Sequence, residues 1–408
     1  MLSPQEKTLI ACVPTASLDA YDLYLNARVV RNRLGSGLES LQEQEQLLER
    51  AVAIDPRFGL AWAKLAWVRC HLSSRTVGGN DTRAAGARAA VEKAKEIIPD
   101  SPEFFLGRGW FLYFVEVDYG RAFAEFQKAT ELSPSFAEAR YALAMVHRRQ
   151  GHWRETLQAL HEVERIDPAN PEYVQEIAVT ALSGRRYAEA EVALRRAMTL
   201  GRTGAAIPRL RFLLPLMSRD ELPSDELWAE LPAGTFKREF DLLRAKPATA
   251  SGADGLLTEA FKLAAKGAKD AVRAQLEQPA RNLRQRTQSE PTNANLWSQL
   301  GVMEALMGNR EEALRCIGKA TGLNPESKDA WLGQSYRTNV AHVHAWTGDT
   351  AGALREYERL LQTMEKRDGF GYVINVHAMR RHPAFAPLRN DPRFKALLDD
   401  PQNNAPLF

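Results

Sequence analysis

The chain has few cysteines and no long apolar run. Cys12, Cys70 and Cys316 are its three cysteines, and they stand far apart among 408 residues. They form no Cys-x-x-Cys pair and no Cys/His group with the spacing of a metal site. No stretch approaches the roughly 18 apolar residues that a membrane span needs. The sequence therefore gives no sign of a disulfide scaffold, a zinc site or a transmembrane segment.

The chain also has almost no net charge. Its 54 Lys and Arg residues stand against 51 Asp and Glu residues, a formal net charge of +3. Nucleic-acid binding needs basic residues clustered on one face, and the locally basic stretch 262–286 spreads its charges over a predicted helical pair. Residues 1–18 lack the basic start and the apolar run of a signal peptide. We expect no direct nucleic-acid partner.

The familiar catalytic motifs are missing as well. There is no phosphate-binding loop, dinucleotide fingerprint, zinc-protease helix or nucleophile elbow. His342 and His344 come nearest to a metal pair, but two residues apart on a helix they point about 200° away from each other. We expect no enzyme activity, no cofactor and no metal. The alternative is an enzyme with its site in the irregular region 203–255.

What the chain does contain is a period of 34 residues. Pro134, Pro168 and Arg202 stand at this spacing. Small and large residues recur between such points, most clearly at Leu300, Gly301, Gly308, Ala313, Ile317, Ala320 and Pro325. This is the tetratricopeptide pattern, in which two antiparallel helices form a unit that is stable only when stacked on its neighbours. It predicts an all-α fold, a tetratricopeptide-repeat α-solenoid built as a right-handed superhelix of helical hairpins.

The period divides the chain into five parts. A lead-in segment covers 1–18, and about five hairpins form an N-terminal array over 19–202. Prolines and glycines interrupt the period over 203–255, which we interpret as an irregular helical joint. About three hairpins follow over 256–365. The tail, 366–408, has apolar clusters that suit a cap over the last apolar face of the array.

Several motifs resemble one bacterial family. They are Pro14-Thr15 with Ala20–Leu25, Arg148-Arg149-Gln150-Gly151-x-Trp153, Ala345–Asp349, and the run from His382 to Phe394. Over nearly its whole length the chain resembles the C-terminal repeat region of TolB-like signalling proteins. In that family a similar array follows an adenylate/guanylate cyclase, a Ser/Thr kinase or a winged-helix DNA-binding domain.

The resemblance implies a sensory or docking module that regulates such an output domain. It also implies a place outside the cytoplasm in members that carry a membrane helix before the array, and a cytoplasmic place otherwise. Because no effector domain precedes Met1, we expect either a fragment or a stand-alone repeat protein. Phe385-Ala386 departs from the family, which usually has a Trp-Asp pair there.

The predicted binding surface is the concave groove lined by the first helix of each repeat. Equivalent positions on these helices give Trp67, His71, Trp110, Tyr113, Tyr141, Met145, Arg148 and Arg149. Aromatic rings beside two arginines suit an extended peptide that carries acidic or C-terminal carboxylate groups. The alternative is that several rings are core between repeats and the arginines are solvated. We therefore expect a protein or peptide partner, or else self-association that dimerises a fused output domain.

Overall fold

The computed structural model describes residues 13–34, 37–75, 80–201, 206–222, 224–230, 253–364 and 374–408. These residues form helices and turns, with no strand among them, so the all-α prediction is confirmed. Most of the predicted lead-in and much of the predicted joint lie outside the described residues. The chain divides into two compact units. The first comprises Met1–Arg148, Arg154–Ile177 and Arg195–Gly204, and the second comprises Arg149–Trp153, Ala178–Leu194 and Ala205–Phe408.

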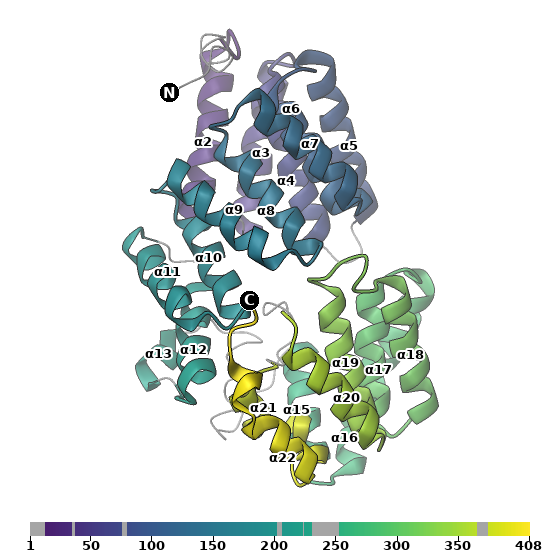
Figure 1. Ribbon diagram of the computed structural model, residues 1–408. Helices are drawn as coiled ribbons and strands as arrows, with labels where there is room; N and C mark the ends of the chain where they lie inside the picture. Colours follow the sequence, from purple (N-terminus) through teal and green to yellow (C-terminus); the bar gives the residue numbers. More distant parts are fainter. Residues whose placement is uncertain are drawn as a thin grey trace. The chain divides into compact units, whose positions relative to one another are not determined.

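The first unit consists of consecutive helical hairpins (Figure 1). The fourth and fifth hairpins are shared, because Arg149–Trp153 at the turn of the fourth and Ala178–Leu194 around the turn of the fifth are counted with the second unit. The helices, in pairs, are α2 (Leu18–Leu34) and α3 (Leu38–Ile54), α4 (Gly59–Arg75) and α5 (Asn80–Ile97), α6 (Pro102–Phe111) and α7 (Tyr119–Leu132), α8 (Ala137–Arg149) and α9 (Trp153–Ile166), and α10 (Pro171–Ser183) and α11 (Tyr187–Thr199). A π-helix, η1 (Leu112–Glu116), continues α6.

Small residues allow these helices to approach closely. A Cβ added to Gly107 of α6 would lie 3.0 Å from the carbonyl oxygen of Ala63 in α4. One added to Gly109 would lie 2.3 Å from the Phe126 ring of α7. Because protein interiors are close-packed, neither position can hold a larger side chain without a shift of its neighbour. The recurring small residues of the sequence are thus packing positions.

The second unit holds further hairpins and a C-terminal helical segment. Its elements are α12 (Ala206–Arg219), α13 (Asp225–Glu230), α15 (Ala253–Ala265), α16 (Lys269–Ser289), α17 (Ala294–Leu306), α18 (Arg310–Leu323), α19 (Gly333–Trp346), α20 (Thr350–Leu361), α21 (Val376–Arg381), η2 (Pro383–Leu388), α22 (Pro392–Asp399) and η3 (Pro401–Asn404). Phe385 of η2 is fully buried and packs on Tyr357 of α20 and Phe394 of α22. The Trp346 indole donates to the carbonyl of Ala384 at 2.8 Å. The C-terminal segment therefore shares one apolar core with the last hairpins.

Two histidines are buried in this core. The Tyr357 hydroxyl and His342 Nδ1 are 2.6 Å apart, and His382 Nδ1 accepts from the backbone N–H of Ala384 at 3.2 Å. Burial lowers the pKa of each imidazole to about 3, with a smaller contribution from Arg389 at His382 and from His382 at His342. His344 points elsewhere and lies 2.9 Å from Asp349 Oδ2.

The hairpin turns use left-handed residues at equivalent positions. Gly308 and Gly348 each have a φ of 84°, which glycine adopts without steric cost. In the α10–α11 turn the equivalent residue is Arg185, with a φ of 59°. The hydrogen-bond pattern identifies it, because Arg186 N–H donates to the Ala181 carbonyl as Asn309 N–H does to that of Glu304. Gly184 therefore precedes the left-handed position.

No helix in the described ranges is long and apolar enough to cross a membrane.

Candidate interaction surface on the first unit

Six of the predicted groove residues form one cluster in the structure. The ring centroids of Trp67 and His71 on α4 are 4.1 Å apart, and those of His71 and Trp110 are 5.4 Å apart. Trp110 continues the row to Tyr113 at 5.2 Å and Tyr141 at 6.4 Å. The Tyr113 hydroxyl donates to the Met145 carbonyl at 3.4 Å. We call this set, together with Phe114 and with Tyr173 of α10, the aromatic layer.

The aromatic layer is mostly covered. Trp67 is 5% exposed, and Trp110 and Tyr113 are each 3% exposed. Burial of such large rings between successive hairpins stabilises their stacking. The layer thus joins the hairpins and forms the base on which charged side chains lie.

The π-helix η1 contributes part of this layer. It contains Tyr113 and Phe114, and it is followed by Val117 with a φ of 53°. A β-branched residue rarely adopts this left-handed conformation, because its side chain crowds the backbone. π-Helical turns often occur at functional sites, and strained backbone of this kind persists where the surrounding packing enforces it.

Charged side chains lie directly over the Trp67 ring. The Arg31 guanidinium carbon is 4.1 Å from the ring centroid, and Lys64 Nζ is 4.7 Å from it. Arg31 pairs with Glu172 of α10 at 3.0 Å, and Lys64 Nζ lies 3.4 Å from both carboxylate oxygens of Glu138 in α8. These pairs join first helices that are not neighbours in the array. We call Arg31, Lys64, Glu138, Arg148, Glu172 and Glu176 the charged layer.

Burial and charge act against each other in this layer. Burial lowers the pKa of Lys64 to about 8, and Arg31 and Arg28 add to the lowering, although Glu138 opposes it. Burial alone would raise the pKa of Glu138, but Lys64, Arg31 and Arg28 lower it to about 2. The Glu138 carboxylate is therefore ionised at neutral pH, and Lys64 is mostly protonated.

The two predicted arginines have different surroundings. Arg148 Nη1 pairs with Glu176 Oε2 of α10 at 2.8 Å and belongs to the charged layer. Arg149 is counted with the second unit, where its Nη1 lies 2.9 Å from Asp329 Oδ2 and its carbonyl accepts from the N–H of Ala330. The structure therefore does not bring Arg149 together with the other candidates.

Sequence reasoning missed the acidic half of this surface. Glu103, Glu138 and Glu172 are each the second residue of a first helix, in α6, α8 and α10. This recurrence is visible in the sequence, but an acidic residue in the first turn of a helix is also favoured by the helix dipole. That explanation hid the second role of Glu138 and Glu172 as partners of Lys64 and Arg31.

The described residues contain no group of three or more His, Cys, Asp or Glu side chains arranged to hold a metal ion. The charged layer presents charged and hydrogen-bonding groups, whereas the rings beneath it are mostly covered.

Comparisons with known proteins agree with the architecture. Residues 141–205 match the family model described as tetratricopeptide repeat. No curated protein matches the chain.

Among solved structures, the chain is similar to PilW, described as a widely conserved type IV pilus biogenesis factor, with 20% identity over 53% of this chain and 93% of that one and a TM-score of 0.38. PilF of Pseudomonas aeruginosa has 18% identity over 50% and 86%, with a TM-score of 0.35. YrrB, described as a TPR protein with an unusual peptide-binding site, has 18% identity over 54% and 99%, with a TM-score of 0.28. The match at 141–205 and the all-helical hairpins together show a tetratricopeptide-type α-solenoid.

Proposed function

We propose that this protein is a non-catalytic interaction scaffold that binds a peptide or protein partner on the charged layer of its first unit. Arrays of tetratricopeptide hairpins create extended surfaces that other proteins occupy. The observation that carries the proposal is the charged layer itself, in which Arg31 and Lys64 lie over the buried Trp67 ring. Cations held over a desolvated ring are placed for recognition of carboxylates.

The contacts of Lys64 favour an acidic ligand. Its 3.4 Å distances to both oxygens of Glu138 are longer than the roughly 2.7–2.9 Å of a strong charge-assisted hydrogen bond. An incoming carboxylate can therefore make a shorter bond to Lys64 than Glu138 does. Glu138 then acts as an internal competitor of the ligand.

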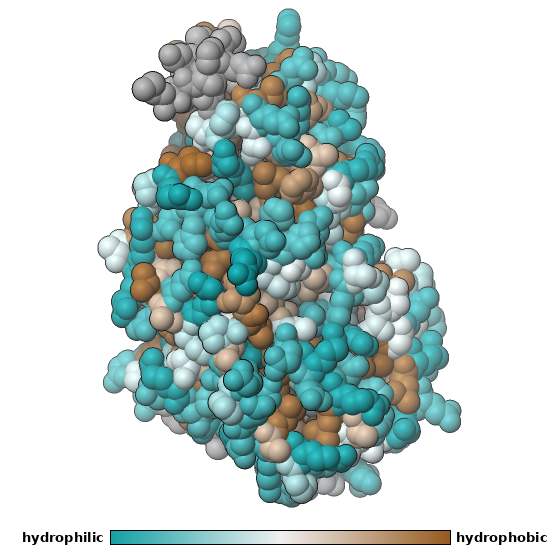
Figure 2. Space-filling model, viewed as in Figure 1, coloured by the Kyte–Doolittle hydropathy of each residue, from teal (hydrophilic) through white to brown (hydrophobic). Residues whose placement is uncertain are grey.

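The hydropathy of the surface can be followed on one face of the molecule. On the face shown in Figure 2, apolar residues occur in small separate groups among polar ones. Interaction sites that depend on apolar area expose larger continuous patches.

The proposed biological setting follows from the resemblance to TolB-like signalling arrays. There the scaffold regulates a fused or associated cyclase, kinase or winged-helix output domain, and pairing of two copies would bring two output domains together. The motifs from Arg148 to Trp153 and from His382 to Phe394 support this setting.

The proposal is tested with peptides selected from a random library displayed on phage, using the immobilised full chain as bait. Selected peptides should be rich in Asp and Glu. Replacing Lys64 and Arg148 together by Gln should weaken their binding by at least tenfold, which corresponds to about 1.4 kcal/mol. Glu138→Gln should strengthen it, because it removes the competitor.

Arg154→Gln is the matched control, since this exposed arginine on α9 carries the same charge outside the charged layer. It should leave peptide affinity unchanged. Thermal unfolding of each variant verifies that the fold is retained. Equal affinity of the selected peptides for the folded Lys64/Arg148 variant and for the unchanged chain would contradict the proposal.

A further inference from the structure

Residues 403–408 lie against the turn between α10 and α11, within the second unit. The Leu407 N–H donates to the carbonyl of Gly184 at 3.0 Å. Arg186 Nη1 donates to the Phe408 carbonyl at 3.2 Å, and its guanidinium carbon is 5.5 Å from the centroid of the Phe408 ring. Main-chain hydrogen bonds of this kind hold extended peptides on protein surfaces.

The turn has space for the Phe408 ring. A Cβ added to Gly184 would lie 2.6 Å from Cε1 of Phe408 and 3.1 Å from Sδ of Met364. Gly184 does not occupy the left-handed position of this turn, which belongs to Arg185. The glycine is therefore needed for space and not for backbone conformation.

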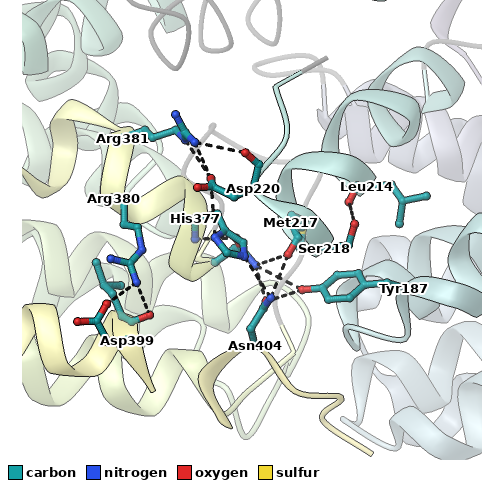
Figure 3. A network of polar contacts seen from close by, with 12 residues as sticks. Tyr187, Leu214, Met217, Ser218, Asp220, His377, Arg380, Arg381, Asp399 and Asn404 are labelled. Atoms are coloured by element: carbon teal, nitrogen blue, oxygen red, sulfur yellow. Dashed lines mark hydrogen bonds and ion pairs between the residues drawn. The ribbon is translucent and has the colours of Figure 1, made fainter. Parts of the chain in front are cut away.

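The side-chain amide of Asn404 is recognised at both ends. Its Oδ1 accepts from the Tyr187 hydroxyl at 2.7 Å and from Asn375 Nδ2 at 2.9 Å. Its Nδ2 donates to the carbonyl of Met217 at 3.2 Å and lies 3.4 Å from Nε2 of His377. Figure 3 shows Asn404 pointing into this group of side chains.

The receiving groups come from separate elements that are fixed to one another. Arg381 of α21 pairs with Asp220, directly after α12, at 2.7 Å. Asn375 is fully buried. Groups held in this way are arranged before the ligand arrives, which lowers the entropy cost of binding. The segment itself is only half-buried, and Pro406 is exposed.

We propose that Gly184, Arg186, Tyr187, Met217 and Asn375 form a peptide-binding site that the chain's own residues 404–408 fill in this structure. Its ligand is an extended peptide with an asparagine followed, three and four residues later, by an aliphatic and an aromatic side chain. A partner with such a segment binds when the chain's own segment is released. The attached segment competes because it is present at high effective concentration. This site lies in the other unit from the charged layer.

The test uses the full chain with Asn404→Ala and Phe408→Ala, which removes the two side chains that hold the segment. The probe is a fluorescently labelled synthetic peptide with the sequence PQNNAPLF of residues 401–408. Hydrogen exchange of residues 405–408 should become faster in the variant, and the probe should bind the variant at least tenfold more tightly than the unchanged chain. A probe with Ala in place of the second Asn should bind at least tenfold more weakly.

Gly184→Val, added to the released variant, should abolish probe binding because its side chain fills the place of the phenylalanine ring. Gly318→Val on α18 is the control, since no atom lies within 4 Å of a Cβ added there. Circular dichroism verifies folding, and Phe408→Ala alone replaces the double variant if that one loses its helical signal.

Three results would overturn the proposal. The first is unchanged exchange of residues 405–408 in the folded variant. The second is a released segment without probe binding. The third is equal probe affinity for the variant and the unchanged chain.

Discussion

At the scale of single residues, the buried imidazoles of His342 and His382 connect stability to pH. Each ring faces Phe385, and the positive charge of Arg389 disfavours a proton on His382. Both histidines therefore stay neutral in the folded state.

We predict that the second unit loses stability as the pH falls from 7.5 to 5. The pKa of each histidine is about 3 when folded and about 6.5 when unfolded. The unfolded state thus binds more protons below pH 6.5, so this contribution to stability is complete above that pH and is lost as the pH falls toward 3. Each histidine should lower the free energy of unfolding by about 2 kcal/mol between pH 7.5 and 5.

Urea denaturation at several pH values measures the effect. His342→Gln keeps an acceptor for the Tyr357 hydroxyl and should reduce the pH dependence by about half. An unchanged pH dependence in this variant would show that the buried histidines are not its source.

The residues of the candidate site could be predicted only in part. Trp67, Trp110 and Tyr141 follow from helical periodicity, because first-helix positions recur along the chain. The pairing of Arg31 with Glu172 could not be foreseen, since it joins residues 141 positions apart. Four junctions between successive hairpins separate the two residues. The curvature of the array at these junctions decides whether the residues meet, and no local sequence pattern predicts that curvature.

At the scale of elements, the turn between η1 and α7 contains Val117, a β-branched residue in left-handed conformation. Among the described residues of the first unit, Val117 is the one β-branched residue with this conformation. We predict that Val117→Gly raises the free energy of unfolding by about 1 kcal/mol, because it removes the steric cost of that conformation.

Gly308→Val should lower the free energy of unfolding by at least a similar amount. Gly308 also has a left-handed conformation, and no atom lies within 4 Å of a Cβ added there. The loss of stability in Gly308→Val therefore measures the backbone strain of the new side chain.

Urea denaturation of the two variants measures both changes. A loss of stability in Val117→Gly would mean that packing of the valine side chain outweighs the strain.

The helices themselves were largely predictable, and their exceptions were not. Hairpins were expected to resume at about residue 256, and the helices α15 and α16 lie there. Local apolar spacing is sufficient for such elements. The π-helix η1 and the left-handed Arg185 depend on neighbouring elements: Arg185 is buried, and its Nη2 donates to the carbonyl of Leu361 at 2.5 Å.

At the scale of the whole molecule, the ion pairs of the first unit change how its hairpins depend on one another. In most repeat proteins each hairpin contacts only its neighbours, so stability is a sum of local terms. Here Arg31 ties the first hairpin to the fifth, and Lys64 ties the second to the fourth.

We predict that Arg31→Met weakens distant hairpins together with its own. It leaves Glu172 as an uncompensated buried charge, which costs about 3 kcal/mol. Hydrogen exchange should therefore become faster in α10 as well as in α2. Arg88→Met is the control, because the Arg88–Glu116 pair is solvent-exposed on the arginine side and exposed pairs contribute little. Faster exchange confined to α2 would contradict the prediction.

These bridges have a mechanical consequence. A chain of hairpins linked only in series peels apart from one end under tension, one repeat after another. Ion pairs between distant hairpins distribute the pulling force over several hairpins. We therefore expect the hairpins of the first unit to unfold together, in a single event, when the unit is pulled.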